Sequence, residues 1–333
     1  MEKTLSLLKK AIPAIITLSL FGLVFGLFAI IYYYNPATIS IELGNVIPIF
    51  AITFLVLAFI VTTVLVVKIP NIHVKRLKRD LGFSKFSSAL AGALVLALFL
   101  FDFIKFILPT TTIPAFKVAR LIFSVPFVTY FVLELIPTKI KRKKVFIPDW
   151  VPQIASLGAV AWCILGLLAT YFWSGKYALP TTNIFKLLHM LYYAVAALFF
   201  LSEICFNFFH KYHRLYIFSG FALFIVSFIL TGSTMLGVFM NKVPGMNISE
   251  FEIIAGVTIG IYALSKMISI AHTIKYLIKK GESGGSHHHR HHHHHHSSKP
   301  SEQADVAADT QGKKSSKPED ATVKQSIEDK LDI

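Results

Sequence analysis

The chain has 333 residues, of which 54% are hydrophobic and 15% are charged, whereas soluble domains carry about 25% charged residues. Its formal net charge is +15 at pH 7. The apolar residues come in blocks of about 20, long enough to cross a hydrocarbon core about 30 Å thick. This pattern excludes a soluble enzyme, a nucleic-acid-binding domain and a disulfide-stabilised secreted scaffold, and it predicts a multi-pass membrane protein.

Eight apolar blocks predict an all-α polytopic bundle, because a backbone in lipid must satisfy its own hydrogen bonds. In chain order the predicted spans are 11–34, 46–68, 87–108, 119–137, 151–173, 187–209, 215–240 and 252–277. Pro126 lies inside the fourth and shortest block, which predicts a kinked or tilted helix there. The first block is too long for a signal peptide, so we interpret it as an uncleaved first span.

The basic residues are distributed unequally between the two sides of the predicted bundle. The segments on one side carry 19 Lys and Arg residues, against 6 on the other side. The positive-inside rule then predicts that both termini are cytoplasmic and that the spans form four outward-pointing hairpins. The basic excess therefore belongs to short loops beside a lipid bilayer and does not indicate nucleic-acid binding. Richness in Phe, Ile and Lys is typical of low-GC bacteria, which favours a bacterial plasma membrane.

Two stretches of the chain resemble each other and predict an internal repeat. Each has a Leu-Pro-Thr-Thr segment, then Phe-Lys, then a basic residue or His four positions after that Phe and a Glu eighteen positions after it. The matched residues are Leu108, Phe116, Arg120 and Glu134 in one copy and Leu179, Phe185, His189 and Glu203 in the other. The last outer loop keeps part of the spacing with Pro244, Ile248 and Phe251, but Ser269 stands in place of the acid eighteen positions after Phe251. Such repeats are common in transporters, although duplication without transport also produces them.

Ionisable side chains inside apolar spans indicate function, because burying them in a membrane is costly. The candidate intramembrane site comprises Glu134, Glu203 and Lys266. In the repeat register Lys266 lies one turn, about 4.5 Å, from the level of the two acids, a distance that a lysine side chain can span. We therefore predict that Lys266 pairs with Glu203 or Glu134 across helices. Such a pair could fix helix packing only, or it could bind a polar solute or relay protons.

Four further residues are candidates at the outer mouth of the bundle. Asp102 and Lys105 are three positions apart and share one helix face, so a local ion pair near the interface is expected, with an outer gate as the alternative. Arg120 and His189 occupy equivalent positions just inside the outer ends of their spans. They are interpreted as interfacial anchors, with a site for an anionic ligand as the alternative.

Two motifs of small residues, Gly22-x3-Gly26 and Gly256-x3-Gly260, permit close approach of helices. Packing within one chain is favoured over dimerisation. The only two cysteines, Cys163 and Cys205, fall inside spans and are interpreted as reduced apolar packing residues.

After the transmembrane domain, residues 1–280, the composition changes, and residues 281–333 are predicted to form a disordered polar cytoplasmic tail. The tail contains nine histidines, which are His287, His288, His289, His291, His292, His293, His294, His295 and His296. A purification tag is the alternative to a natural tract, and the 37 residues that follow the histidines favour the natural tract. Such a tract binds divalent metals loosely. A short helix with Val323, Ile327 and Leu331 on one face could form on a cytoplasmic partner.

Three functions are compatible with these features, and no nucleotide-binding, zinc-protease or nucleophile motif occurs, so no cofactor is expected. The first is a small-solute or ion transporter that uses the intramembrane charges, which predicts a water-accessible cavity around them. The second is a non-catalytic membrane scaffold or sensor that acts through its tail, which predicts tight packing around the charges. The third, an intramembrane enzyme acting on a lipid, is disfavoured because no group of residues has catalytic spacing.

Overall fold

The computed structural model describes residues 2–35, 40–42, 44–70, 82–107, 115–136, 139–140, 143–144, 147–148, 150–172, 184–209, 212–242 and 250–285. Within this part, eight helical segments are long and apolar enough to cross a membrane, which confirms the prediction of eight apolar spans and is compatible with a multi-pass membrane protein. The predicted tail lies outside the described residues from position 286 onward, and with it the nine histidines.

The helices follow the apolar blocks closely. Their bounds are α1 Glu2–Tyr33, α2 Val46–Lys68, α3 Gly82–Ile107, α4 Ala115–Leu135, α5 Trp150–Tyr171, α6 Ile184–Phe209, α7 His213–Val226, α8 Gly232–Phe239 and α9 Glu250–Gly285. A π-helical turn, η1 (Ser227–Thr231), joins α7 to α8 within one span. The largest differences from prediction are at the two ends, where α1 begins at Glu2 rather than residue 11 and α9 continues to Gly285.

Two short antiparallel strand pairs lie in the connections. β1 (Tyr34–Asn35) pairs with β2 (Ser40–Ile41) between α1 and α2. β3 (Lys139–Ile140) pairs with β4 (Lys143–Lys144) between α4 and α5. Both pairs are too short to form a sheet core, so the packing of the helices positions the site.

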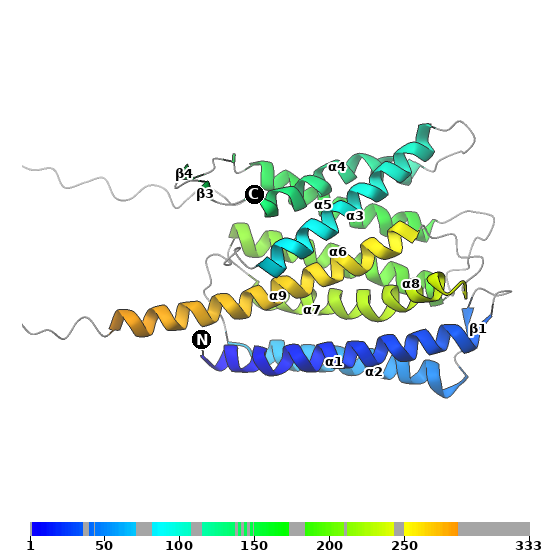
Figure 1. Ribbon diagram of the computed structural model, residues 1–333, viewed down its shortest axis with the longest axis horizontal. Coiled ribbons are helices and arrows are strands. Elements are labelled where there is room, and N and C mark those ends of the chain that lie inside the picture. Colours follow the sequence, from blue (N-terminus) through cyan, green and yellow to red (C-terminus); the bar gives the residue numbers. More distant parts are fainter. Residues whose placement is uncertain are drawn as a thin grey trace, which may run out of the picture. The chain divides into compact units, whose positions relative to one another are not determined.

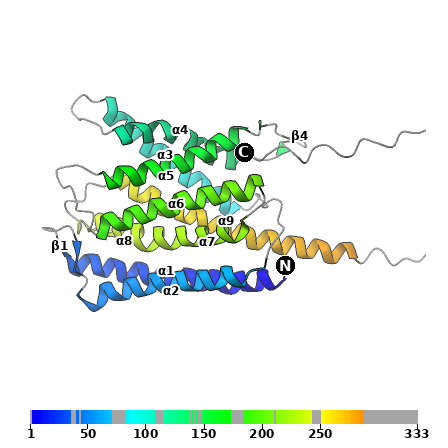
Figure 2. The same cartoon turned by 180° about the vertical axis from the view of Figure 1, so that it is seen from behind.

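Six helices form a closed ring in which each packs on the next. Figures 1 and 2 show them side-on, with the pair α1 and α2 along the lower edge in both views. In order around the ring these are α3, α4, α5, α6, α7 and α9, and α9 closes the ring by packing on α3. The pair α1 and α2 lies outside this ring, with α1 against η1, α8 and α9 and α2 against α7. Consequently α9 is enclosed on several sides. In its most apolar stretch of 18 residues 83% of the residues are buried, against 17% in the corresponding stretch of α2.

Both small-residue motifs pack against the same π-helical turn. Gly22 and Gly26 of α1 face η1 and the start of α8, while Gly256 and Gly260 of α9 face η1 from another helix. A Cβ atom added to Gly260 would overlap the Cβ of Ser227. The glycines therefore serve packing within the chain, as expected, and allow two helices to approach a segment whose backbone is wider than an α-helix.

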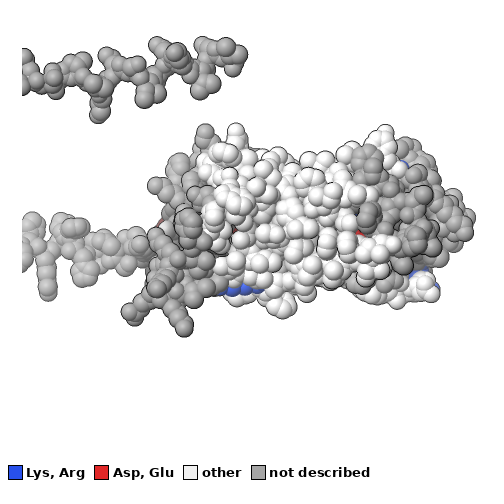
Figure 3. All heavy atoms as spheres, turned by 90° about the horizontal axis from the view of Figure 1, so that it is seen from above, with Lys and Arg blue, Asp and Glu red and all other residues white. Residues whose placement is uncertain are grey.

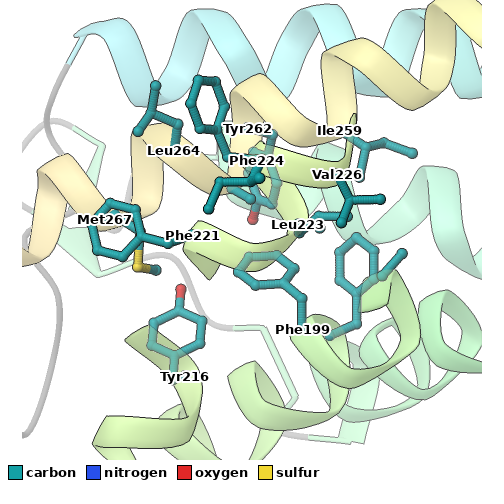
Figure 4. Packing of buried hydrophobic residues seen from close by; sticks show 14 of the residues in the cluster. Phe199, Tyr216, Phe221, Leu223, Phe224, Val226, Ile259, Tyr262, Leu264 and Met267 are labelled. Carbon is teal, nitrogen blue, oxygen red and sulfur yellow. The ribbon is translucent and has the colours of Figure 1, made fainter. Parts of the chain in front are cut away.

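The outside and the inside of the described helices differ in chemistry. Figure 3 shows a face whose middle carries almost no Lys, Arg, Asp or Glu, while coloured charges lie nearer its two ends. In the interior, Phe199, Tyr216, Phe221, Tyr262 and Met267 from α6, α7 and α9 pack together (Figure 4). The interior is thus rich in aromatic rings, some of which carry hydroxyl groups.

Candidate functional site

Helices α4, α6 and α9 are linked across the ring by hydrogen bonds between long side chains. Three such pairs join α4 to α9, and two join α4 to α6. The α4–α9 pairs, each 132 positions apart, are Arg120–Glu252, Tyr130–Tyr262 and Glu134–Lys266. The α4–α6 pairs, each 73 positions apart, are Arg120–Tyr193 and Tyr130–Glu203. The two residue numbers differ by the same amount in every α4–α9 pair, and likewise in both α4–α6 pairs. In antiparallel helices the sum of the two numbers would be constant instead, so the three helices run parallel and in register around the interior.

The sequences of α4 and α9 explain why the charges meet. In α4 the order is Arg120-x9-Tyr130-x3-Glu134, while α9 has an acid, a tyrosine and Lys266 at the same spacing. In α4 the cation comes first and the acid last, whereas in α9 the acid comes first and the cation last. Two such helices that run parallel and in register therefore place a cation against an acid at both levels. Fourteen residues of helix separate the two levels by about 21 Å.

The first level is named here the lysine cluster and contains all three predicted intramembrane residues. Lys266 Nζ lies 2.6 Å from Glu134 Oε2 and 3.4 Å from Glu203 Oε1. The exposed fractions of the three side chains are 5% for Lys266, 10% for Glu134 and 2% for Glu203. The structure therefore brings Lys266 together with both acids, from three different helices.

Three tyrosines complete the lysine cluster. Tyr130 donates a hydrogen bond to Glu203 Oε2, and Tyr216 Oη lies 3.3 Å from Glu203 Oε1. The hydroxyls of Tyr130 and Tyr262 are 2.6 Å apart. The result is a continuous hydrogen-bonded chain from Tyr262 through Tyr130 to Glu203, which then reaches Lys266. Such a chain can hold a small cation between carboxylates or pass protons between oxygen atoms.

Aromatic rings pack closely around the lysine cluster. The ring of Tyr130 lies edge-on to Phe200 with centroids 5.5 Å apart, and the rings of Phe199 and Tyr216 stack at 5.6 Å. In such an apolar environment the attraction between opposite charges is stronger than in water, but desolvating each charge is costly. Removing one charged partner would therefore be far more damaging than removing a surface ion.

The second level, named the arginine cluster, is built around Arg120. Its Nη1 atom lies 2.9 Å from Glu252 Oε1 and its Nη2 atom 2.7 Å from Tyr193 Oη, while Tyr193 itself donates to Glu252. The guanidinium carbon lies 4.0 Å from the ring centroid of Trp162 and 5.0 Å from that of Tyr193. Trp162 Nε1 in turn donates to Ser124 Oγ at 3.0 Å, which fixes the indole ring that lies against the guanidinium. The guanidinium is therefore oriented both by its hydrogen bonds and by the ring on its face.

Three buried polar atoms in the arginine cluster have no hydrogen-bond partner among the residues that the structure describes. They are Arg120 Nε, His189 Nε2 and Tyr192 Oη. The ring of His189 lies 5.8 Å from that of Tyr193 and 6.4 Å from that of Tyr192. A buried polar group without a partner costs about 1–3 kcal/mol, so three in one cluster indicate an unused capacity for hydrogen bonding.

The four residues predicted at the outer mouth have different positions. Arg120 of α4 is only 8% exposed, and His189 of α6 is half-buried, with its ring beside those of Tyr192 and Tyr193. Asp102 is half-buried on α3 and interacts with other residues. Lys105 belongs to α3, but its side chain lies outside what the structure describes.

Glu252 and the tyrosines are site residues that the apolar pattern does not reveal. Glu252 stands at the very start of the last predicted span, where a charge is ordinary. The matched spacing of Arg120, Tyr130 and Glu134 with Glu252, Tyr262 and Lys266 is the signal that could have found it. The two cysteines are free thiols, with Cys163 buried and Cys205 half-buried.

Comparison with protein-family models, with curated proteins and with solved structures finds no match to this chain. Function must therefore be argued from its own two polar clusters.

Proposed function

We propose that this protein carries a small polar solute or ion across a cell membrane and that the lysine cluster is its charge-compensated intramembrane site. The observation that supports this most is Lys266, held between Glu134 and Glu203 from two other helices. Each charged side chain at the centre of a membrane helix costs about 3 kcal/mol by insertion scales, and such residues commonly mark ion pathways and proton relays. Three of them meeting in one place suggest more than packing.

The proposed orientation has both termini in the cytoplasm, as the distribution of Lys and Arg between the loops predicts. In that orientation the lysine cluster lies toward the cytoplasmic side and the arginine cluster toward the outer side. The four outward-pointing hairpins would then place α4, α6 and α9 as the helices that return inward. A bacterial plasma membrane is the proposed location.

The two clusters would act as alternating gates. Every ion pair in them joins α9 to α4 or α6, so a small tilt of α9 relative to those helices would separate the partners at one end while the cluster at the other end stays closed. The separation of about 21 Å along the helices leaves room for a solute between the two levels. Alternating access by relative movement of helix groups is the usual mechanism of secondary transporters.

The alternative is a non-catalytic scaffold or sensor that acts through the cytoplasmic tail. One observation favours it: the rings of Phe200 and Phe199 pack closely on Tyr130 and Tyr216 of the lysine cluster. On that interpretation the buried ion pairs only fix the order of the helices.

Flux measurements on reconstituted vesicles distinguish the two functions. Wild type, Glu203→Gln and the control Glu42→Gln, which changes an exposed carboxylate outside the helices, are placed in proteoliposomes. Vesicles are shrunk by a panel of sugars, amino acids, and sodium and potassium salts, and solute entry is followed by light scattering. Transport predicts that at least one solute enters with wild type and Glu42→Gln but not with Glu203→Gln. If no solute enters with wild type and Glu203→Gln only lowers the melting temperature, the lysine cluster serves packing.

A further inference from the structure

We propose, resting on the transport function above, that the arginine cluster binds the carboxylate group of a small organic acid and that Glu252 occupies the same position when no acid is bound. The solute class would then be small carboxylates. Arg120 would bind the ligand, and Glu252 would act as a competing ligand supplied by the chain itself.

Arg120 is held in an orientation that suits a carboxylate ligand. Its guanidinium lies against the rings of Trp162 and Tyr193, at 4.0 and 5.0 Å from their centroids, and its side chain is 10% exposed. Arginine presents a planar fork of N–H donors that matches the two oxygens of a carboxylate. A fork that is already oriented loses little conformational freedom on binding, which favours affinity.

The surroundings of this fork contain unused hydrogen-bonding capacity. Arg120 uses Nη1 and Nη2 for Glu252 and Tyr193, whereas its Nε has no partner among the described residues. Glu252 therefore leaves one donor of the guanidinium unused, and a second polar group of a ligand whose carboxylate replaced Glu252 at Nη1 could accept from it. Tyr192 and His189 of α6 offer two more unsatisfied atoms in the same aromatic cluster, suited to hydrogen bonds with the rest of a polar ligand.

Glu252, the ion-pair partner of Arg120, is placed so that it can leave the guanidinium. Its side chain is 20% exposed, twice the value for Arg120, and it is the third residue of α9. The first turn of a helix favours a carboxylate, because unpaired backbone N–H groups give it partial positive charge. A released Glu252 would therefore remain stabilised, and exchange of one carboxylate for another would keep the charge beside Arg120 constant.

A carboxylate fits this cluster better than a phosphate. One guanidinium compensates one negative charge, while a phosphate would bring nearly two into an apolar environment. The position that the ligand would take is at present filled by a carboxylate oxygen at 2.9 Å from Nη1. The rings of Trp162 and Tyr193, which meet edge to face with centroids 6.0 Å apart, would suit an apolar or aromatic remainder of the ligand.

The test is direct binding to the purified full-length chain in detergent. The probes are sodium acetate, lactate, succinate and benzoate, with acetamide and benzamide as uncharged matches and sodium chloride and sodium phosphate as anion controls. Melting temperature and tryptophan fluorescence are measured as each probe is titrated. We expect at least one carboxylate to give a saturable shift that its amide does not give.

The variants assign the binding to this cluster. Arg120→Lys keeps the charge but loses the fork, and it should weaken binding by about tenfold or more. Glu252→Gln removes the internal competitor and should strengthen binding by about tenfold. The matched control is Arg214→Lys, because Arg214 donates to the carbonyl of Ile69 at the lysine-cluster end of the bundle. Tyr192→Phe removes a hydroxyl without a partner, so it should fold normally and still bind more weakly.

The proposal is overturned if no carboxylate binds to wild type or Glu252→Gln, if phosphate binds in preference, or if Arg120→Lys and Tyr192→Phe both bind as wild type does. A lower affinity in Glu252→Gln would contradict its role as a competitor. Because binding is measured without transport, the two proposals can fail separately. Carboxylate binding without flux would leave a receptor site, and flux of another solute without carboxylate binding would leave the transporter.

Discussion

Lys266 and Glu134 form an ion pair with 2.6 Å between Nζ and Oε2, although they belong to helices that are far apart in the chain. Their separation of 132 positions equals that of Arg120 and Glu252 at the other end of the same two helices. One register between α4 and α9 therefore produces both ion pairs, and a change that shifts either helix would disturb both clusters.

Replacement of Lys266 should destabilise the protein strongly. Lys266→Met leaves Glu134 and Glu203 facing each other without their cation, and loss of one partner of a buried pair costs about 3–5 kcal/mol. The loss is measured as a lower melting temperature in detergent and a lower midpoint in denaturant. Lys10→Met, at an exposed position of α1, is the control and should change little. Equal effects of the two substitutions would show that the buried pairs contribute no stability.

Tyr130 and Tyr262 should behave as a coupled pair. Tyr130→Phe removes the hydroxyl that donates to Glu203 and contacts Tyr262 Oη at 2.6 Å, so it should cost about 1–3 kcal/mol. Tyr262→Phe removes one of the same hydrogen bonds. The double variant should therefore cost less than the two single changes added together, by about 0.5 kcal/mol or more. Strict additivity in a double-mutant cycle would argue against a shared hydrogen-bonded chain.

Substitution of Gly260 tests the packing of α9 against η1. A Cβ at this position overlaps the Cβ of Ser227, which cannot move without moving the backbone, so Gly260→Ala should cost about 1–3 kcal/mol. Gly82→Ala is the control, since a Cβ added there would meet no described atom of another segment within 4 Å. A combined Ser227→Gly change should restore part of the loss in thermal melting. Unchanged stability of Gly260→Ala would mean that the two helices are not in close contact.

The orientation of the bundle is testable by cysteine labelling in a variant that lacks Cys163 and Cys205. Glu42 follows β2 and Lys3 lies in the first turn of α1, and both side chains are exposed. A membrane-impermeant maleimide on intact cells should label Glu42→Cys but not Lys3→Cys. Both should react after permeabilisation. The reverse pattern would place the termini outside and exchange the sides of the two clusters.

Sequence reasoning predicted the elements well because each apolar block satisfies a local requirement. A segment of about 20 apolar residues without charges must form a helix in lipid, whatever its neighbours are. The predicted span at 46–68 coincides with α2, and the one at 187–209 differs from α6 by three residues at its start. The expectation that Lys266 reaches one of two acids used only the repeat register and the length of a lysine side chain.

The partners within the clusters were much less accessible to sequence reasoning. Neighbouring helices and lipid tails are both apolar, so hydropathy does not show which face of a span is inside. For example, α2 and α9 both read as membrane spans, yet α2 is mostly exposed and α9 mostly buried. Glu252 at the start of α9 became a site residue only because α9 packs beside α3 and across the ring from α4.

The sequence by itself therefore determined the number, length and type of the membrane segments, since these depend on local composition and on the thickness of a bilayer. The tertiary structure decided which charges meet. That choice depends on the order of helices in the ring and on a single register between α4, α6 and α9, and contacts such as Gly260 against Ser227 set how closely those helices approach.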